Sequence, residues 1–245
     1  MVKLLFKPKI YPLLNSQNLN QEEFLDNLNV KGDDLEKTLD SLAFINKYFG
    51  NINSLSRTVC NLTLNRFNNE VSIVDLGCGK GDCLEAIRKI LNSKNIRTNL
   101  LGIDGNSEII KYAKHCYPNI SFTQDDILTE KFIPPPCDIM ISSHFIYHLD
   151  EHHLPDFLEK LKTQKVKFAV FSELYRSSMS YFLFKIASPI LPINRIAKKD
   201  GLIAIRRAYS IDKLKAILET ANVNFTIKKR PFFRVIVEID LKTSF

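Results

Sequence analysis

Three alternating glycines, Gly77, Gly79 and Gly81, lie in the segment VDLGCGKGD, whose residue types and spacing are suited to ligand binding. An apolar run at residues 71–76 predicts a strand before them, and the residues from Asp82 onward have helical spacing. Glycine tolerates positive φ and lets a ligand approach the backbone closely, and the first turn of a helix has unpaired amides. The segment therefore predicts a binding surface for a nucleoside-bearing ligand at a strand-to-helix turn.

A second acidic position strengthens this prediction. Asp104 ends the next apolar segment, residues 99–104. A carboxylate at that place in an α/β sheet accepts hydrogen bonds from ribose hydroxyls. The alternative is a surface aspartate that caps the following helix.

Nicotinamide dinucleotides are the main rival ligand, because they bind at the same edge of such sheets. Their turn has the spacing Gly-x-Gly-x-x-Gly, whereas here Asp82 stands where the third glycine would be. A carboxylate near a helix N-terminus repels a pyrophosphate. S-adenosylmethionine has no phosphate and carries a positive sulfonium, so charge favours it as the ligand.

These segments resemble the class I S-adenosylmethionine-dependent methyltransferases. Residues 74–81 resemble the first motif of that family, and residues 102–104 resemble its acidic second-strand motif. Residues 122–128 resemble the segment whose acid contacts adenine, and residues 137–149 resemble the fourth-strand motif with the loop beyond it. The resemblance covers about residues 50–175.

The resemblance implies a bound methyl donor, S-adenosyl-L-methionine, and S-adenosyl-L-homocysteine as the product. It implies that Asp104 binds the ribose and that Asp126, with Ile127 beside the ring, contacts adenine; Asp125 replaces the glycine usual before that acid. No metal ion is expected. The residues expected to contact the donor are Asp75, Gly77, Cys78, Gly79, Gly81, Asp104, Gly105, Asp126, Ile127 and Ser142.

Candidate catalytic residues follow the fourth and fifth predicted strands, where ligands of open α/β sheets bind. They are His144, His148 and Glu173. A hydroxyl acceptor must lose a proton, which suits histidine with its ordinary pKa of about 6.5. Either histidine acts as the base, or neither does and alignment alone suffices; a merely packed or capping histidine is the alternative. Glu173 either orients the acceptor or pairs with Arg176.

Strand and helix patterns alternate after Glu70, which predicts an α/β fold with a parallel sheet covered on both faces. The resemblance implies a Rossmann-like sheet of seven strands, one of them antiparallel. The expected strands are 71–76, 99–104, 120–123, 138–142, 166–172, 224–229 and 232–239, and the expected helices between them are 82–91, 107–116, 154–162 and 210–220.

Two regions lie outside this alternation. Residues 1–50 are predicted to form a helical N-terminal extension, with a helical pattern over 21–49 that Gly32 interrupts before an N-cap at Asp33 or Asp34. A further helix is expected over 54–67. The methyltransferase domain is expected to span 51–245, with a lid or substrate insertion at 175–207 after the fifth strand. Within that insertion, ordinary burial and a membrane-surface helix are alternatives to a lid.

Charge and cysteine content limit the possible partners and the cellular compartment. The formal net charge is +7, and twelve basic but only three acidic residues lie between Lys185 and Arg234. Such a region either attracts an anionic or carrier-bound substrate or is an ordinary solvated face. Five cysteines without a CxxC pair predict no disulfide framework and a reducing, cytoplasmic setting. No apolar run long enough for a membrane span and no secretory signal is expected.

The function predicted from the sequence is methyl transfer to the oxygen of an aromatic, polyketide-like or other apolar hydroxyl or carboxyl compound. Transfer to carbon or nitrogen of a small molecule is the alternative. A nucleic-acid methyltransferase, suggested by the pI of 9.1 and the basic C-terminal part, is a less favoured alternative. Nucleic acid is not the expected partner, because residues 142–145 read SSHF where DNA amino-methylating enzymes carry Asn/Asp-Pro-Pro-Tyr/Phe. A protein that binds the donor without catalysis is a third hypothesis.

Overall fold

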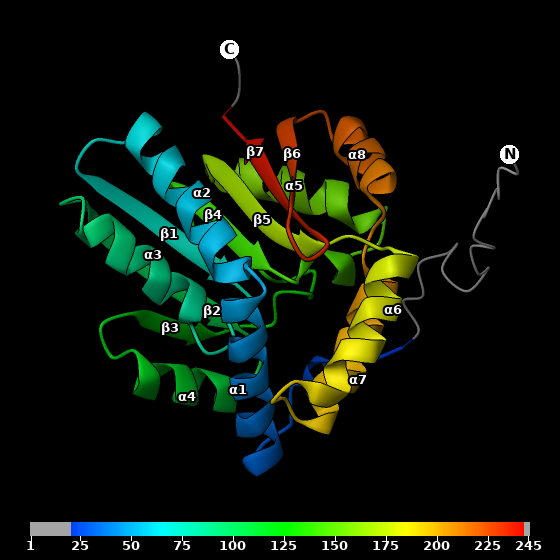
Figure 1. Ribbon diagram of the computed structural model, residues 1–245. Coiled ribbons are helices and arrows are strands. Elements are labelled where there is room, and N and C mark those ends of the chain that lie inside the picture. Colours follow the sequence, from blue (N-terminus) through cyan, green and yellow to red (C-terminus); the bar gives the residue numbers. More distant parts are fainter. Residues whose placement is uncertain (1–20, 243–245) are drawn as a thin grey trace, which may run out of the picture.

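A mixed sheet of seven strands, in the order β3-β2-β1-β4-β5-β7-β6, runs through the middle of the protein (Figure 1). The computed structural model describes residues 21–242. Strand β7 is antiparallel to both of its neighbours, and the other pairs are parallel. The strands are β1 (Glu70–Leu76), β2 (Arg97–Asp104), β3 (Ser121–Gln124), β4 (Ile139–Ser143), β5 (Phe168–Leu174), β6 (Asn224–Arg230) and β7 (Arg234–Asp240). The predicted α/β class and seven-stranded sheet are confirmed.

Helices cover both faces of this sheet (Figure 1). The α-helices are α1 (Asp33–Tyr48), α2 (Asn51–Arg66), α3 (Asp82–Asn92), α4 (Ser107–Cys116), α5 (His153–Thr163), α6 (Ser178–Ala187), α7 (Arg195–Arg207) and α8 (Ile211–Thr220). Short 3-10 turns lie at η2 (Phe24–Asp26), η3 (Ile146–His148) and η4 (Ser188–Ile190). Within residues 21–242, no helix has the length and apolar content needed to cross a bilayer.

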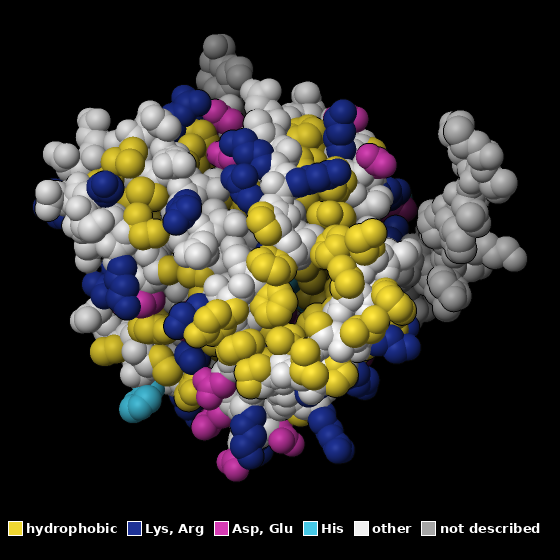
Figure 2. Space-filling view, in the orientation of Figure 1, with side chains coloured by type: hydrophobic (Ala, Val, Ile, Leu, Met, Phe, Trp, Pro, Cys, Tyr) yellow, Lys and Arg dark blue, Asp and Glu magenta, His cyan; other side chains and the backbone are white. Residues whose placement is uncertain are grey.

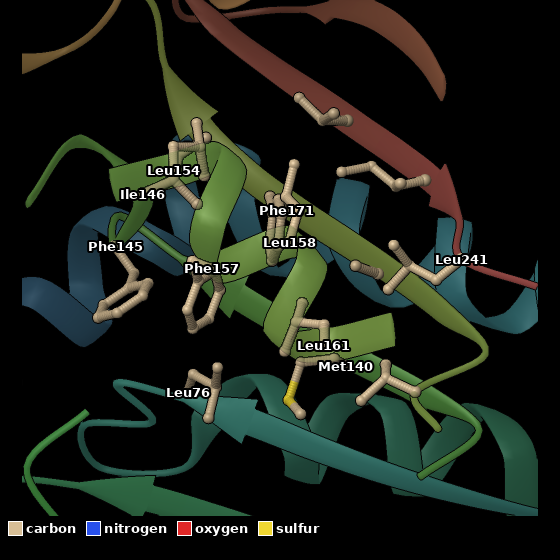
Figure 3. Close-up of a cluster of buried hydrophobic side chains, with 14 of the residues drawn as sticks. Leu76, Met140, Phe145, Ile146, Leu154, Phe157, Leu158, Leu161, Phe171 and Leu241 are labelled. Carbon is tan, nitrogen blue, oxygen red and sulfur yellow. The ribbon is translucent and has the colours of Figure 1, made fainter. Parts of the chain in front are cut away.

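The central strands are apolar on both sides because each side packs against helices. Toward α5 and α8, side chains of β1, β4 and β5 form one cluster, which includes Leu76, Met140 and Phe171 (Figure 3). Their neighbours Ile73 and Ile141 point to the other face and pack with α2 and α3. This continuous burial is why the strand patterns were readable in the sequence, and every strand lies within two residues of its expected bounds.

The N-terminal region differs from the expected helical pattern over 21–49. Only η2 and α1 are helical there, and Gly32, with φ +78°, precedes α1 as its N-cap. Glycine adopts this conformation readily, so the chain turns at Gly32 and the helix begins one residue later. Asp33 and Asp34, expected as caps, lie in the first turn instead, where they stabilise the positive end of the helix dipole.

The region between α1 and α2 also differs from the prediction. Gly50, with φ +77°, joins the two helices, and α2 begins at Asn51 rather than at residue 54. The early start places the Asn51 side chain against the ends of β4 and β5: its Nδ2 donates to Ser143 Oγ at 2.5 Å, and its Oδ1 accepts from Ser172 Oγ at 2.5 Å.

The insertion after β5 consists of α6, η4 and α7, which lie side by side (Figure 1). Phe184 of α6 packs on Gly201 of α7, where an added Cβ would lie 2.6 Å from the ring. Asn194 caps α7 and donates from its Nδ2 to Thr38 Oγ1 of α1 at 2.8 Å. The insertion is therefore fastened to the N-terminal helix beside the carboxyl ends of the strands.

Candidate functional site

The glycine turn after β1 has the conformation that its sequence predicts. Gly77, Gly79 and Gly81 have φ of +68°, +52° and +91°. The amides of Gly77 and Cys78 donate to the carbonyl of Ile103 at 2.9 and 3.0 Å, which holds the turn against β2. A Cβ added at Gly79 would meet no heavy atom within 4 Å, so the turn presents an open backbone surface.

Asp104 lies beside this turn at the end of β2. Its Oδ2 accepts from the Gly79 amide at 3.1 Å, and its Oδ1 accepts from the Asn106 amide at 3.1 Å. Burial raises the pKa of its carboxyl. The alternative role as a helix cap is wrong, because Asn106 caps α4 by accepting from the amides of Glu108 and Ile109.

Asp75, the last residue but one of β1, is a second buried acid near the turn. It is 2% exposed, and its Oδ1 has no hydrogen-bond partner among the described residues. Burial raises its pKa well above the ordinary value, and the negative charge of Asp104 raises it further. A cationic ligand would relieve the repulsion between these two carboxylates. The two carboxylates therefore fit a ligand that carries a positive sulfonium, and the open backbone at Gly79 lets such a ligand come close to the turn.

The residues expected at the adenine lie along the same edge of the sheet. Asp126 follows β3 and is half-buried, with its Oδ1 accepting from the Leu128 amide at 3.2 Å. Ile127 is 8% exposed and joins the core cluster. Gly105 begins the loop to α4, and an added Cβ there would lie 2.8 Å from the side chain of Leu28.

Leu28 belongs to a covering segment that the sequence did not reveal. The segment runs from η2 to Gly32, and the Asn106 side chain donates to the carbonyl of Val30 in it at 2.9 Å. It therefore covers the side of the donor site at Gly105. No motif marks these residues, because their role depends on contact with positions 76 residues further along the chain.

Two more of the residues expected to contact the methyl donor, Ser142 and Cys78, have side chains buried inside the protein. Ser142 is fully buried, and its hydroxyl donates to the Leu76 carbonyl at 2.9 Å, which ties β4 to β1. Cys78 is 8% exposed, and its Sγ lies 2.8 Å from the position of a Cβ added at Gly102. The backbone of the turn, rather than these two polar atoms, faces the open space.

Glu173, at the end of β5, is 2% exposed. Its Oε1 accepts from the amides of Phe145 and Ile146 at 2.9 and 3.1 Å, whereas its Oε2 has no partner among the described residues. Burial raises its pKa to about 8, and the two amide bonds and Arg234 oppose that shift. The alternative pairing with Arg176 is not found, since Nη1 of Arg176 is also buried without a partner.

His144 stands in the left-handed region, with φ +58°, directly after β4. Its Nε2 lies 2.6 Å from Nη1 of Arg234, which also donates from Nε to the Phe49 carbonyl at 3.0 Å. A guanidinium only donates, so Nε2 accepts and the ring proton is on Nδ1. Burial, and then the charge of Arg234, lower the pKa of His144 well below its usual value.

His148 is enclosed by charged groups from two other elements. Its Nδ1 lies 2.9 Å from Nη2 of Arg207 in α7 and 3.4 Å from Oδ1 of Asp26 in η2. Burial, and then the charge of Arg207, lower its pKa to about 4, against an opposing effect of Asp26. Tyr147 stacks on its ring with centroids 4.5 Å apart. By contrast, His152 and His153 are exposed at the start of α5.

A hollow with a largely hydrophobic rim opens between the β6–β7 turn, α6 and the upper end of α1 (Figure 2). Phe232 in that turn and Tyr48 at the end of α1 are 53% and 60% exposed. The carboxyl ends of β4 and β5 lie at the same edge of the molecule. An apolar opening therefore adjoins the strand ends that carry His144 and Glu173.

A family model described as a methyltransferase domain matches residues 73–164, which include the glycine turn, Asp104, Asp126 and both candidate histidines. Over this segment the chain is similar to the methyltransferase domains. The expected resemblance to methyltransferases is thus confirmed for this segment, and a solved structure of the same fold, the plantazolicin methyltransferase BpumL, is complexed with S-adenosylhomocysteine.

Relatives and solved structures agree with this assignment. The chain is 37% identical over 71 residues to protein 235L of Invertebrate iridescent virus 6, whose name assigns it provisionally to the methyltransferases. That match covers 29% of this chain and a quarter, 25%, of the viral protein.

Solved structures share the fold at low sequence identity. An S-adenosylmethionine-dependent methyltransferase from Aquifex aeolicus has a TM-score of 0.57 at 16% identity, over 86% of this chain and 100% of that one. The plantazolicin methyltransferase BpumL, with a pentazolic substrate analogue and S-adenosylhomocysteine, reaches 0.65 at 16% identity, over 85% and 91%. Magnesium protoporphyrin IX methyltransferase from Synechocystis PCC 6803 reaches 0.52 at 13% identity, over 86% and 89%.

Proposed function

We propose that this methyltransferase moves the methyl group of S-adenosylmethionine to an oxygen atom of an apolar small molecule. The observation that carries the proposal is the buried carboxyl of Glu173, whose Oε2 has no partner, beside an opening with a hydrophobic rim. An apolar acceptor suits that rim, and an acceptor hydroxyl or carboxyl supplies the hydrogen-bonding group that Oε2 lacks.

The donor side follows from the glycine turn. Asp104 accepts from the ribose hydroxyls, Asp126 and Ile127 hold the adenine, and the open backbone at Gly79 lies along the ligand. Asp75 offsets the positive charge of the donor. The donor supplies an electrophilic methyl group on a good leaving group, so the main tasks left to the protein are alignment and proton removal.

The proton of the acceptor is assigned to Glu173 rather than to a histidine. A general base works best when its pKa lies near the working pH. The pKa of His148 is about 4, and its Nδ1 already accepts from Arg207. The pKa of Glu173 is about 8, and one oxygen is available. His144 and His148 then act as positioning residues for the loop after β4.

The arrangement of the chain into parts is also part of the proposal. Residues 51–245 form the methyltransferase domain, and residues 1–50 form an N-terminal cap whose first 20 residues lie outside the described part. The insertion at 175–207 acts as a lid beside the acceptor. The contacts of α7 with α1, and of the segment after η2 with Gly105 and Asn106, support this division.

A labelling experiment tests the acceptor class. The full chain is incubated with donor labelled in the methyl group and with matched apolar phenols, carboxylic acids, anilines and activated carbon acids. We expect label in ethers or esters, and no label in analogues whose oxygen is already methylated. Label that enters only nitrogen or carbon acceptors would overturn the choice of oxygen, and tight donor binding without turnover on any class would overturn catalysis.

A further inference from the structure

Helix α6 turns its apolar side toward solvent. Met179, Phe182, Leu183 and Ile186 are 65%, 61%, 49% and 59% exposed, and Ile190 in the following η4 turn is 85% exposed. Their spacing of three, four and seven residues places them along one side of the helix. The five side chains, named here the α6 apolar face, form a continuous hydrophobic stripe.

The orientation of α6 is fixed by its opposite side. Phe184 packs on Gly201, and the hydroxyl of Tyr181 accepts from Nη2 of Arg206 at 2.6 Å. Ser180 is buried and donates to the carbonyl of Ser177 at 2.8 Å. The aromatic rings of Phe184 and Tyr181 and the polar Ser180 thus face the protein, while four other large apolar side chains of α6 face outward, which is unusual for a surface helix.

The charged side chains that lie near the α6 apolar face in the sequence, up to the buried Asp200, have one sign. Residues 175–199 contain five basic side chains, Arg176, Lys185, Arg195, Lys198 and Lys199, and no acidic one. Lys185, Arg195 and Lys199 are exposed. Apolar side chains flanked by basic ones are the composition that binds anionic lipid headgroups while inserting into the acyl boundary.

The α6 apolar face is continuous with the opening already described. In Figure 2 the hydrophobic surface extends from α6 to the rim of the hollow below the β6–β7 turn. Phe232 at that turn is 53% exposed and stacks edge-on with Phe49, with ring centroids 5.2 Å apart. A surface that rests on α6 would therefore lie next to the entrance to the acceptor site.

We propose that the α6 apolar face docks on an anionic lipid bilayer and that the apolar acceptor enters from that bilayer. The docking itself does not depend on the proposed function, whereas the entry of the acceptor from the bilayer rests on it. Large apolar side chains with high exposure favour insertion into lipid over contact with an acidic carrier protein, where paired charges would dominate. The flanking lysines and arginines add attraction that salt screens.

Vesicle co-sedimentation of the full chain tests the docking. Vesicles of phosphatidylcholine alone are compared with vesicles in which about a third of the lipid is phosphatidylglycerol. We expect binding to the anionic vesicles, at least tenfold weaker binding to the neutral ones, and a severalfold loss at high salt. The double variant Phe182→Ser with Ile186→Ser should lose at least tenfold in partitioning, and Lys185→Glu severalfold.

A matched control removes equally exposed apolar side chains elsewhere. Leu64, near the end of α2, and Ile133, before β4, are 51% and 66% exposed at the opposite edge of the sheet. Leu64→Ser with Ile133→Ser should bind vesicles as the wild type does. Calorimetric binding of S-adenosylhomocysteine should be equal in all variants, which shows that each is folded.

The outcomes separate this inference from the proposed function. Absence of binding to anionic vesicles, or an equal loss in the control variant, overturns the docking. So does light scattering that shows a dimer abolished by the α6 substitutions, or capture of an acidic carrier protein without vesicle binding. Vesicle binding without methyl transfer overturns the proposed reaction alone, and transfer without vesicle binding overturns the docking alone.

Discussion

At the scale of single residues, Asp104 lies against the glycine turn, and we propose that it binds the ribose of the donor. Its carboxylate already accepts from the amides of Gly79 and Asn106, which fixes its orientation before a ligand arrives. Hydrogen bonds to a charged acceptor contribute about 1.5–3 kcal/mol each. Asp104→Ala should therefore weaken S-adenosylhomocysteine binding by about a hundredfold in calorimetry. Asp125→Ala, an exposed neighbour, is the control, and equal affinity of both variants would refute the assignment to the ribose.

Glu173 presents a conflict between stability and activity. Its folded pKa is about 8, well above the ordinary value of 4.5, so burial favours the neutral form. Below the unfolded pKa both states are protonated and folding loses nothing. As pH rises from about 4.5 to 8 only the unfolded state ionises, so stability falls, by up to about 3 kcal/mol at pH 7. Glu173→Gln keeps the oxygen that accepts from Phe145 and Ile146, and should flatten this decline in urea unfolding.

Catalysis should depend on pH in the opposite sense to stability, because the ionised form of Glu173 is the active one. In the wild type, kcat should rise with pH through about 8 as the carboxyl ionises and becomes a base. Glu173→Gln should lose at least about a hundredfold in kcat, with donor affinity unchanged and no inflection near pH 8. An unchanged inflection in the variant would show that another group takes the proton.

At the scale of elements, Phe122 of β3 explains why two glycines are needed. A Cβ at Gly102 would lie 2.5 Å from its ring, and one at Gly81 would lie 2.7 Å away. Overpacking of this kind costs about 1–3 kcal/mol. Gly102→Ala should lower the urea midpoint accordingly, and Phe122→Leu in the same chain should recover part of the loss. Additive losses in the double variant would show that the ring is not what excludes the Cβ.

The elements also show where sequence reasoning succeeds. Parallel strands buried on both faces, such as β1 and β4, read as short apolar runs, and the glycine turn that follows β1 is a local signal. The segment from η2 to Gly32 carries no such signal, because Leu28 packs on the distant Gly105 rather than on a neighbouring turn of helix. The same reason hid Asn51 and Arg234, whose partners lie 92 and 90 positions away in the chain.

At the scale of the whole molecule, Arg207 joins three parts that are far apart in sequence. It is 6% exposed in α7, with Nη1 2.5 Å from Asp26 and 3.4 Å from Glu23 of the N-terminal segment. Its Nη2 meets His148 of the loop after β4 at 2.9 Å. Burial raises the pKa of Glu23 to about 8, so the closer Asp26 is the main partner of Arg207 near neutral pH. One side chain of the insertion thus contacts both the N-terminal segment and the loop after β4.

Loss of that side chain should open the cap rather than unfold the sheet. Arg207→Met leaves the half-buried Asp26 without its partner, an arrangement that costs up to about 3 kcal/mol unless the segment moves into water. Because the segment carries Leu28 onto Gly105, we expect faster amide exchange at residues 24–30 and about tenfold weaker donor binding. Adding Asp26→Asn should restore part of both, since the stranded charge is then gone. The control Lys111→Met removes the exposed ion pair with Glu108 and should change neither amide exchange nor donor binding. Unaltered amide exchange in Arg207→Met would show that apolar contacts alone hold the cap.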